Sequence, residues 1–152
     1  MATSASPAAR LTSAAVVVIR RSIPGCRAPK SASRGTSQVS AKNGVAQPGF
    51  QKFLALVNDG SKRCWVKLTG IYRFSQAPHY ADVKPFAQAL IALAPDRLIW
   101  GSDFPQLSFA DKVGTIELYN HLVEWAPDAA MRARILADNP ARLFGFGKGA
   151  IP

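Results

Sequence analysis

The residue that most suggests chemistry is Asp103, in the stretch "IWGSDFPQ" (residues 99–106). It follows a short apolar run that is typical of a buried strand, and Pro105 comes two residues later. A carboxylate at the end of a core strand could serve as a general base in an active site. The alternative is structural, an aspartate that caps or turns the chain ahead of Pro105.

A second pair of candidates, Tyr72 and Arg73, follows the run "CWVKLTG" (residues 64–70), which also predicts a strand. A planar guanidinium can hold a substrate carboxylate through two parallel hydrogen bonds. Tyr72 could add a hydroxyl group or pack beneath such a site. The alternative for Arg73 is an ordinary surface position in a loop.

The two histidines are weaker candidates. His79 lies in the predicted loop "SQAPHY" and could approach a substrate, whereas His121 lies in the middle of a predicted helix. A metal site needs three or four ligands, and Asp103 has no suitably spaced histidine. We therefore expect this chain to bind no metal. Cys26 and Cys64 also lack metal-site spacing, and they indicate a reduced, cytoplasmic protein.

The elements that must position these residues are expected from Gly44 onward, where hydrophobic periodicity begins. Asp82 and Asp128 are the expected N-caps of two helices, and Pro140 is expected to break the last helix and restart it. In the third helix, Ile116, Tyr119, Leu122 and Val123 fall in helical register. The expected helices are 48–60, 81–97, 111–127 and 128–146, and the expected strands are 64–70 and 97–103.

This order of helices and strands predicts an α/β fold in which the strands are parallel and joined by right-handed crossovers. Two strands alone do not form a stable parallel sheet, because both faces must be covered. We therefore expect residues 44–152 to be part of a larger α/β domain.

Residues 1–43 differ in composition, since they are rich in Ala, Ser and Arg and contain no acidic or aromatic residue. We expect this tail to be largely disordered, apart from a short helix or strand at residues 14–21. Three interpretations remain open. The tail could be an organelle transit peptide, a basic arm that binds nucleic acid or protein, or a coding sequence translated in a shifted frame.

The net charge of +10 is concentrated in this tail, because residues 1–49 hold seven Lys or Arg and no Asp or Glu. The remaining residues hold 12 basic and 9 acidic side chains, so a nucleic-acid partner is the weaker hypothesis. The longest compact apolar run near the start, residues 14–19, is too short to cross a membrane. We expect no membrane partner.

The strings "WVKLTGIYR", "PDRLIWGSDFP" and "DNPARLFGF" occur in an order that resembles the C-terminal part of the amidohydrolase-related family, in the branch of the 2-pyrone-4,6-dicarboxylate lactonases. The resemblance covers residues 44–146. It implies a TIM barrel, with residues 64–70 as strand 7, residues 98–103 as strand 8, and the helices in the outer ring.

The resemblance also implies roles for the site residues. Asp103 would take a proton from the attacking water, or ligate a divalent metal in an intact family member, and Arg73 would hold a carboxylated small-molecule substrate. Lys67 would either point into the barrel mouth or form a structural ion pair. Gln106 departs from the family pattern, which has histidine there, so the substrate stays open. Because a barrel needs roughly 250 residues, we expect this chain to be truncated and inactive alone.

Overall fold

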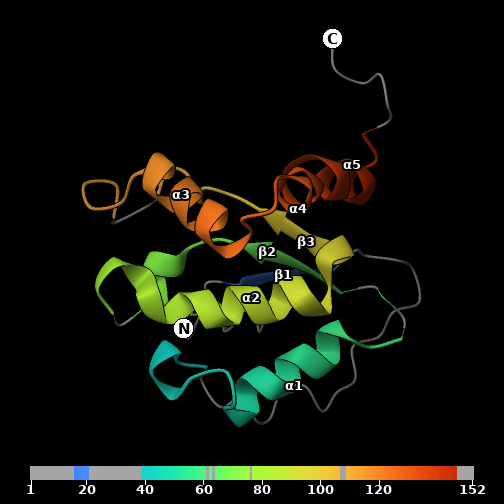
Figure 1. Cartoon of the computed structure of the whole chain (residues 1–152), viewed down its shortest axis with the longest axis horizontal. Helices are drawn as coiled ribbons and strands as arrows, with labels where there is room; N and C mark the ends of the chain where they lie inside the picture. Colours follow the sequence, from blue (N-terminus) through green and yellow to red (C-terminus); the bar gives the residue numbers. More distant parts are fainter. Residues whose placement is uncertain are drawn as a thin grey trace, which may run out of the picture.

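The computed structural model describes residues 16–20, 39–60, 62, 64–75, 77–106 and 109–146. Its sheet has three strands in the order β1 (Val16–Arg20), β2 (Cys64–Leu68) and β3 (Leu98–Trp100) (Figure 1). Strands β2 and β3 are parallel, as predicted, and Lys67 lies beside Ile99 in their register. Strand β1 pairs antiparallel along the whole of β2. A strand was one of the two possibilities expected at residues 14–21, but its place in the sheet was not predicted.

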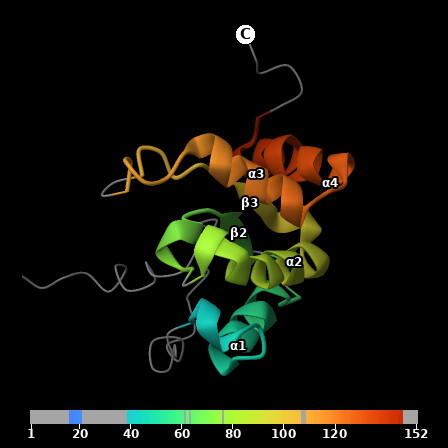
Figure 2. The ribbon, with the colours of Figure 1, turned by 60° about the vertical axis from the view of Figure 1, so that its left-hand side comes forward.

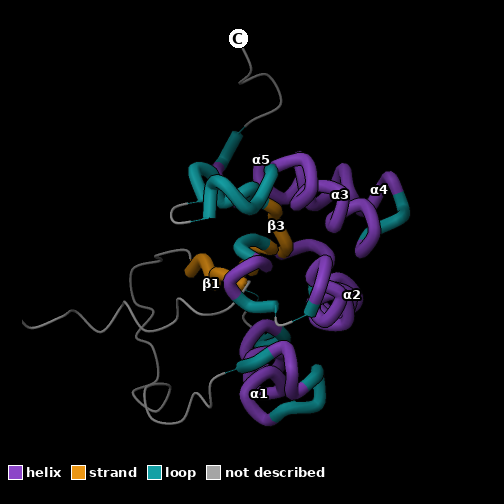
Figure 3. Tube along the Cα trace, turned by 90° about the vertical axis from the view of Figure 1, so that its left-hand side faces the viewer, coloured by secondary structure: helices purple, strands orange, loops and turns teal. Residues whose placement is uncertain are grey.

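In the described part of the chain, the sheet is accompanied by the α-helices α1 (Pro48–Val57), α2 (Lys84–Leu93), α3 (Thr115–Trp125), α4 (Ala129–Ala133) and α5 (Asn139–Phe144) (Figure 2). Helix α2 belongs to the connection between the parallel strands β2 and β3. Helices α2 and α3 lie on the same side of the strands (Figure 3). None of the helices within the described ranges is long and apolar enough to span a membrane.

The main core lies on one face of the sheet, where Val66 and Leu98 are fully buried with Leu90 of α2. Phe86 of α2 contacts Phe50 of α1 and Phe74 after β2, with ring centroids 4.7 Å and 5.1 Å apart. Side chains alternate between the faces of a strand. Trp65 and Ile99 accordingly form a second, smaller cluster with Leu143 of α5 on the other face.

The predicted N-caps had different outcomes. Asp128 is the N-cap of α4, as expected, and its carboxylate accepts hydrogen bonds from the N–H groups of Ala130 and Met131. The prediction for Asp82 was wrong, because α2 begins after a 3-10 segment (Pro78–Val83) and its N-cap is Val83. Asp82 instead accepts a hydrogen bond from the Ser75 hydroxyl group, which ties the 3-10 segment to the loop after β2.

Pro140 does not break the last helix as predicted. The chain runs from α4 through a π-helical segment (Arg134–Asp138) into α5 without leaving helical dihedral angles at the junctions. A π-helical turn shifts the hydrogen-bond pattern by one residue, which suits a position where proline lacks an N–H donor.

The apolar face of α3 also differs from the predicted register. Leu118, Leu122 and Trp125 are the buried residues of this helix, whereas the side chain of Ile116 is 77% exposed. The helix begins at Thr115, four residues later than expected, and Ile116 in its first turn points to solvent.

Candidate active site

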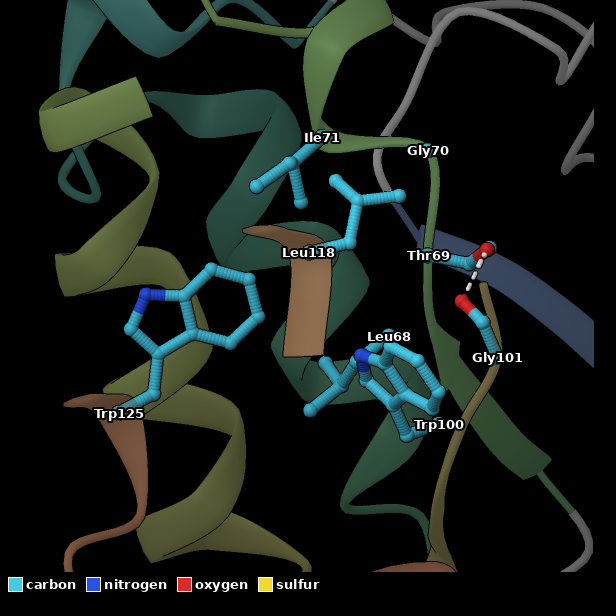
Figure 4. Close-up of a pocket in the computed structure, with 8 residues that line it drawn as sticks. All are labelled: Leu68, Thr69, Gly70, Ile71, Trp100, Gly101, Leu118 and Trp125. Carbon is cyan, nitrogen blue, oxygen red and sulfur yellow. Dashed lines mark hydrogen bonds between the residues drawn. The ribbon is translucent and has the colours of Figure 1, made fainter. Parts of the chain in front are cut away.

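The candidate site begins where the parallel strands β2 and β3 end. The Gly101 N–H donates to the Leu68 carbonyl at 3.3 Å, and the Thr69 hydroxyl donates to the Gly101 carbonyl at 2.9 Å (Figure 4). These two bonds extend the pairing beyond the last strand residues. They hold together the two chain segments that carry Tyr72, Arg73 and Asp103.

Asp103 contacts two of the other predicted site residues, Tyr72 and Arg73. The Tyr72 hydroxyl donates to Asp103 Oδ2 at 2.7 Å, and Arg73 Nε lies 3.7 Å from the same oxygen. Tyr72 and Arg73 belong to a 3-10 turn (Ile71–Arg73) directly after β2, so both side chains reach the end of β3. The structure therefore brings together three of the four predicted site residues.

Gly70 makes this close approach possible. Its φ of +63° lies in the left-handed region, which glycine adopts without steric cost. A Cβ atom at this position would lie 3.4 Å from Asp103 Oδ2. Gly70 was not predicted as a site residue, although a glycine directly after a predicted strand is a signal for such a turn.

Aromatic rings orient the Arg73 side chain. Its Cζ lies 5.2 Å from the ring centroids of both Tyr72 and Phe109, and those two rings are 5.0 Å apart. A guanidinium over aromatic faces gains cation–π stabilisation. The Arg73 side chain is 39% exposed, so the stacked group can still be reached from solvent. Phe109 was missed because it lies in a loop without periodicity.

The environment of Tyr72 changes its acidity. Burial raises the pKa of the Tyr72 hydroxyl above its ordinary value of 10.0, the hydrogen bond to Asp103 raises it further, and Arg73 opposes both effects. The phenol is therefore protonated at neutral pH and acts as a hydrogen-bond donor to the carboxylate.

The loop that carries Asp103 has an unusual backbone. Asp103 and Gln106 have φ values of +59° and +47°, a region that non-glycine residues seldom occupy. Gln106 supports this conformation, because its N–H donates to the Asp103 carbonyl at 2.8 Å and its side-chain amide donates to the Ser102 carbonyl at 2.9 Å. Gln106 is only 5% exposed and holds the loop that presents Asp103.

His79 is the fourth predicted site residue. Its side chain is exposed in the 3-10 segment before α2, and its φ is +52°. None of the contacts recorded between described residues joins His79 to Asp103. His121 lies in α3, where its ring contacts Tyr80 and Trp125 at centroid distances of 5.4 Å and 6.1 Å. These contacts make His121 a packing residue.

The donors around Asp103 do not fit a metal centre. Across the described ranges, no three His, Cys, Asp or Glu side chains come close enough to share an ion. The Arg73 guanidinium also lies 3.7 Å from Oδ2 of this carboxylate, and its positive charge opposes a second cation beside it. We therefore derive the chemistry of this chain from its own side chains.

A small hollow lies between these strand ends and α3. Most of its surface comes from the side chains of Leu68, Ile71, Trp100, Leu118 and Trp125 (Figure 4). The backbone of Gly70 and Gly101 lies at one side. Its lining is mainly apolar, and it adjoins the turns that present Arg73 and Asp103.

A carboxylate at the end of a parallel strand, with an arginine and a tyrosine from the neighbouring strand end, is the arrangement expected at the catalytic face of an α/β hydrolytic enzyme. The family model described as "Amidohydrolase" matches residues 35–146, and the chain belongs to this family. The resemblance proposed from the sequence is confirmed.

The chain is similar to several proteins whose names refer to lactones or to 2-pyrone-4,6-dicarboxylic acid. It is 43% identical over 118 residues to the 4-sulfomuconolactone hydrolase of Hydrogenophaga intermedia, covering 74% of this chain and 38% of the relative. It is 34% identical over 101 residues to the D-galactarolactone isomerase of Agrobacterium fabrum, and the alignment covers 64% of this chain and 34% of that relative. The chain also aligns with a crystal structure of a probable 2-pyrone-4,6-dicarboxylic acid hydrolase from Acinetobacter baumannii with citric acid bound. The TM-score is 0.60 and the sequence identity is 29%, and the alignment covers 71% of this chain and 40% of the solved one.

The chain therefore spans less than half the length of these relatives. The activity and substrates that their names describe belong to those proteins.

Proposed function

We propose that Tyr72, Arg73 and Asp103 form part of the active site of a lactone hydrolase that acts on carboxylated substrates. The observation that supports this proposal most strongly is the convergence of Tyr72 and Arg73 on Asp103 Oδ2, at 2.7 Å and 3.7 Å. The relatives named as lactone hydrolases support the same substrate class.

In the proposed reaction, Asp103 is the general base. Both recorded contacts of its carboxylate with described residues fall on Oδ2, so we assign proton transfer to Oδ1. Water attacks the lactone carbonyl carbon while its proton passes to Asp103. The ring C–O bond then breaks, and the leaving oxygen takes the proton back from Asp103. Tyr72 keeps the carboxylate in position throughout.

Arg73 is the proposed substrate anchor. Its side chain is partly exposed and packs against two rings, so little side-chain entropy is lost when it binds a carboxylate. Direct contact of Tyr72 or His79 with the substrate stays a prediction. A nucleic-acid or protein partner for the basic tail is favoured by no observation.

We further propose that β2 and β3 correspond to the last two strands of a family TIM barrel, within a domain of residues 44–152. Their parallel pairing and the alignment with the Acinetobacter baumannii structure are consistent with this assignment. On that basis we expect the 152-residue chain alone to hydrolyse lactones negligibly, because a complete site draws residues from several strands.

A chimera tests the proposed roles. The segment of this chain that aligns with the Hydrogenophaga intermedia hydrolase would replace the matching segment of that enzyme, and hydrolysis of 4-sulfomuconolactone would be measured. We expect the chimera to be active and Asp103→Asn to lower kcat by about 10²- to 10⁴-fold.

The controls separate the outcomes. Asp111→Asn, an exposed position in the following loop, should leave kcat unchanged. A folded chimera in which Asp103→Asn keeps full activity would contradict the role of Asp103. A product that is a rearranged lactone instead of a ring-opened acid would show that the site supports isomerisation and would contradict hydrolysis.

A further inference from the structure

Lys67 is a charged residue that the proposed mechanism does not use. Its position is the one in β2 that is not fully buried, and it lies on the sheet face opposite the main core, beside Ile99 of β3. Among the described residues, no hydrogen bond or ion pair is recorded for its ammonium group. A partly buried ammonium without a partner is costly, so such a group favours binding an anion.

The direction of the side chain is set by Gly101. Lys67 pairs with Ile99, yet its Nζ lies 2.9 Å from the point that a Cβ atom on Gly101 would occupy. The side chain therefore leans along β3 toward the strand's C-terminal end. Asp103 follows Gly101 by two residues in the turn after β3. The missing side chain of Gly101 leaves the space that the Lys67 side chain occupies.

We infer that Lys67 is a specificity-determining residue that binds a second anionic group of the substrate, a carboxylate or sulfonate, while Arg73 binds the first. This inference rests on the proposed function of Arg73 and Asp103. The two cations lie on separate elements: Arg73 is stacked on aromatic rings, and Lys67 lies against Gly101. Such a pair favours a substrate with two separated anionic groups over a substrate with one.

The test compares two ligands on the full chain. Titrations followed by NMR or calorimetry would give Kd for 2-pyrone-4,6-dicarboxylate and for 2-pyrone-6-carboxylate, which lacks one carboxylate. We expect the dicarboxylate to bind about tenfold more tightly to the wild-type chain, as for one charge-assisted contact. In Lys67→Met the preference should disappear while the monocarboxylate affinity stays unchanged.

Two further variants distinguish a loss of anion binding from a loss of folding. Lys67→Arg should keep part of the preference, because it keeps the charge. Gly101→Ala should reduce the preference, because the new methyl group displaces the flexible end of Lys67 and leaves its charge in place. Thermal melts would confirm that each variant is folded.

The outcomes distinguish this inference from the proposed function. If folded Lys67→Met keeps the wild-type preference, the role of Lys67 is wrong, although Arg73-dependent binding of both ligands would still support the substrate anchor. If both ligands bind and their affinities are independent of Arg73, the proposed function itself is contradicted.

Discussion

At the scale of single residues, the site depends on small departures from regular backbone. Gly70 and Asp103 both have positive φ, and this geometry lets the carboxylate lie over the turn after β2. A strained non-glycine position such as Asp103 often occurs at a functional site, where the surrounding structure holds it in place. Here Gln106 provides that support through its contacts to residues 102 and 103.

The ionisation of Tyr72 gives a prediction at this scale. Because the pKa of Tyr72 is raised in the folded protein, its contribution to stability is complete below pH 10.0 and is lost as the pH rises through the raised value. We expect the stability difference between the wild-type chain and Tyr72→Phe to shrink above pH 10.

Thermal melts across alkaline pH and the ultraviolet absorbance of tyrosinate would measure this effect. Burial also raises the pKa of Tyr80, so Tyr80→Phe provides the matched control. Removing Tyr72 should remove a late-titrating component from the absorbance curve. Titration of Tyr72 at its ordinary value would contradict its burial and its bond to Asp103.

At the scale of elements, β1 covers the edge of β2 that faces away from β3. An exposed edge strand presents unpaired N–H and C=O groups that promote aggregation. Strand β1 pairs from Val16 opposite Leu68 to Arg20 opposite Cys64, so it satisfies the backbone along the whole edge. The sheet therefore depends on residues from the basic N-terminal segment.

A double proline substitution tests this pairing. In an antiparallel pair alternate N–H groups face the partner, so either Val17 or Val18 donates to β2. Val17→Pro/Val18→Pro should remove that bond, lower stability by about 1 kcal/mol or more, and speed hydrogen exchange of β2 amides.

The matched control is Val17→Thr/Val18→Thr, which keeps both N–H groups and β-branched side chains. It should leave amide exchange in β2 close to the wild-type rate. Equal protection of β2 in the proline variant and in this control would mean that β1 does not pair as the structure shows.

At the scale of the whole molecule, part of the account could be predicted from sequence and part could not. Periodicity and strand order predicted the helices and the parallel pair β2–β3. The family resemblance assigned Arg73 and Asp103 to one site, but their contact through Oδ2 was not predicted. The antiparallel place of β1 could not be predicted, since pairing depends on which edge is available in three dimensions.

Two other predictions from the sequence were wrong for related reasons. The N-cap of α2 shifted from Asp82 to Val83 because Ser75, seven residues away, binds the Asp82 carboxylate. Ile116 matched the helical period but is exposed, because α3 begins later than its apolar pattern suggested. Periodicity identifies a face, while neighbouring elements decide how far that face is covered.

The central claim is that Arg73 beside Asp103 binds a substrate carboxylate, and one measurement tests it most directly. The Kd of 2-pyrone-4,6-dicarboxylate would be determined by NMR titration for the wild-type chain, for Arg73→Met and for Arg73→Lys. We expect Arg73→Met to weaken binding by about tenfold or more and Arg73→Lys to recover only part of the loss, because lysine lacks the planar fork. Unchanged affinity in a folded Arg73→Met chain would contradict the claim.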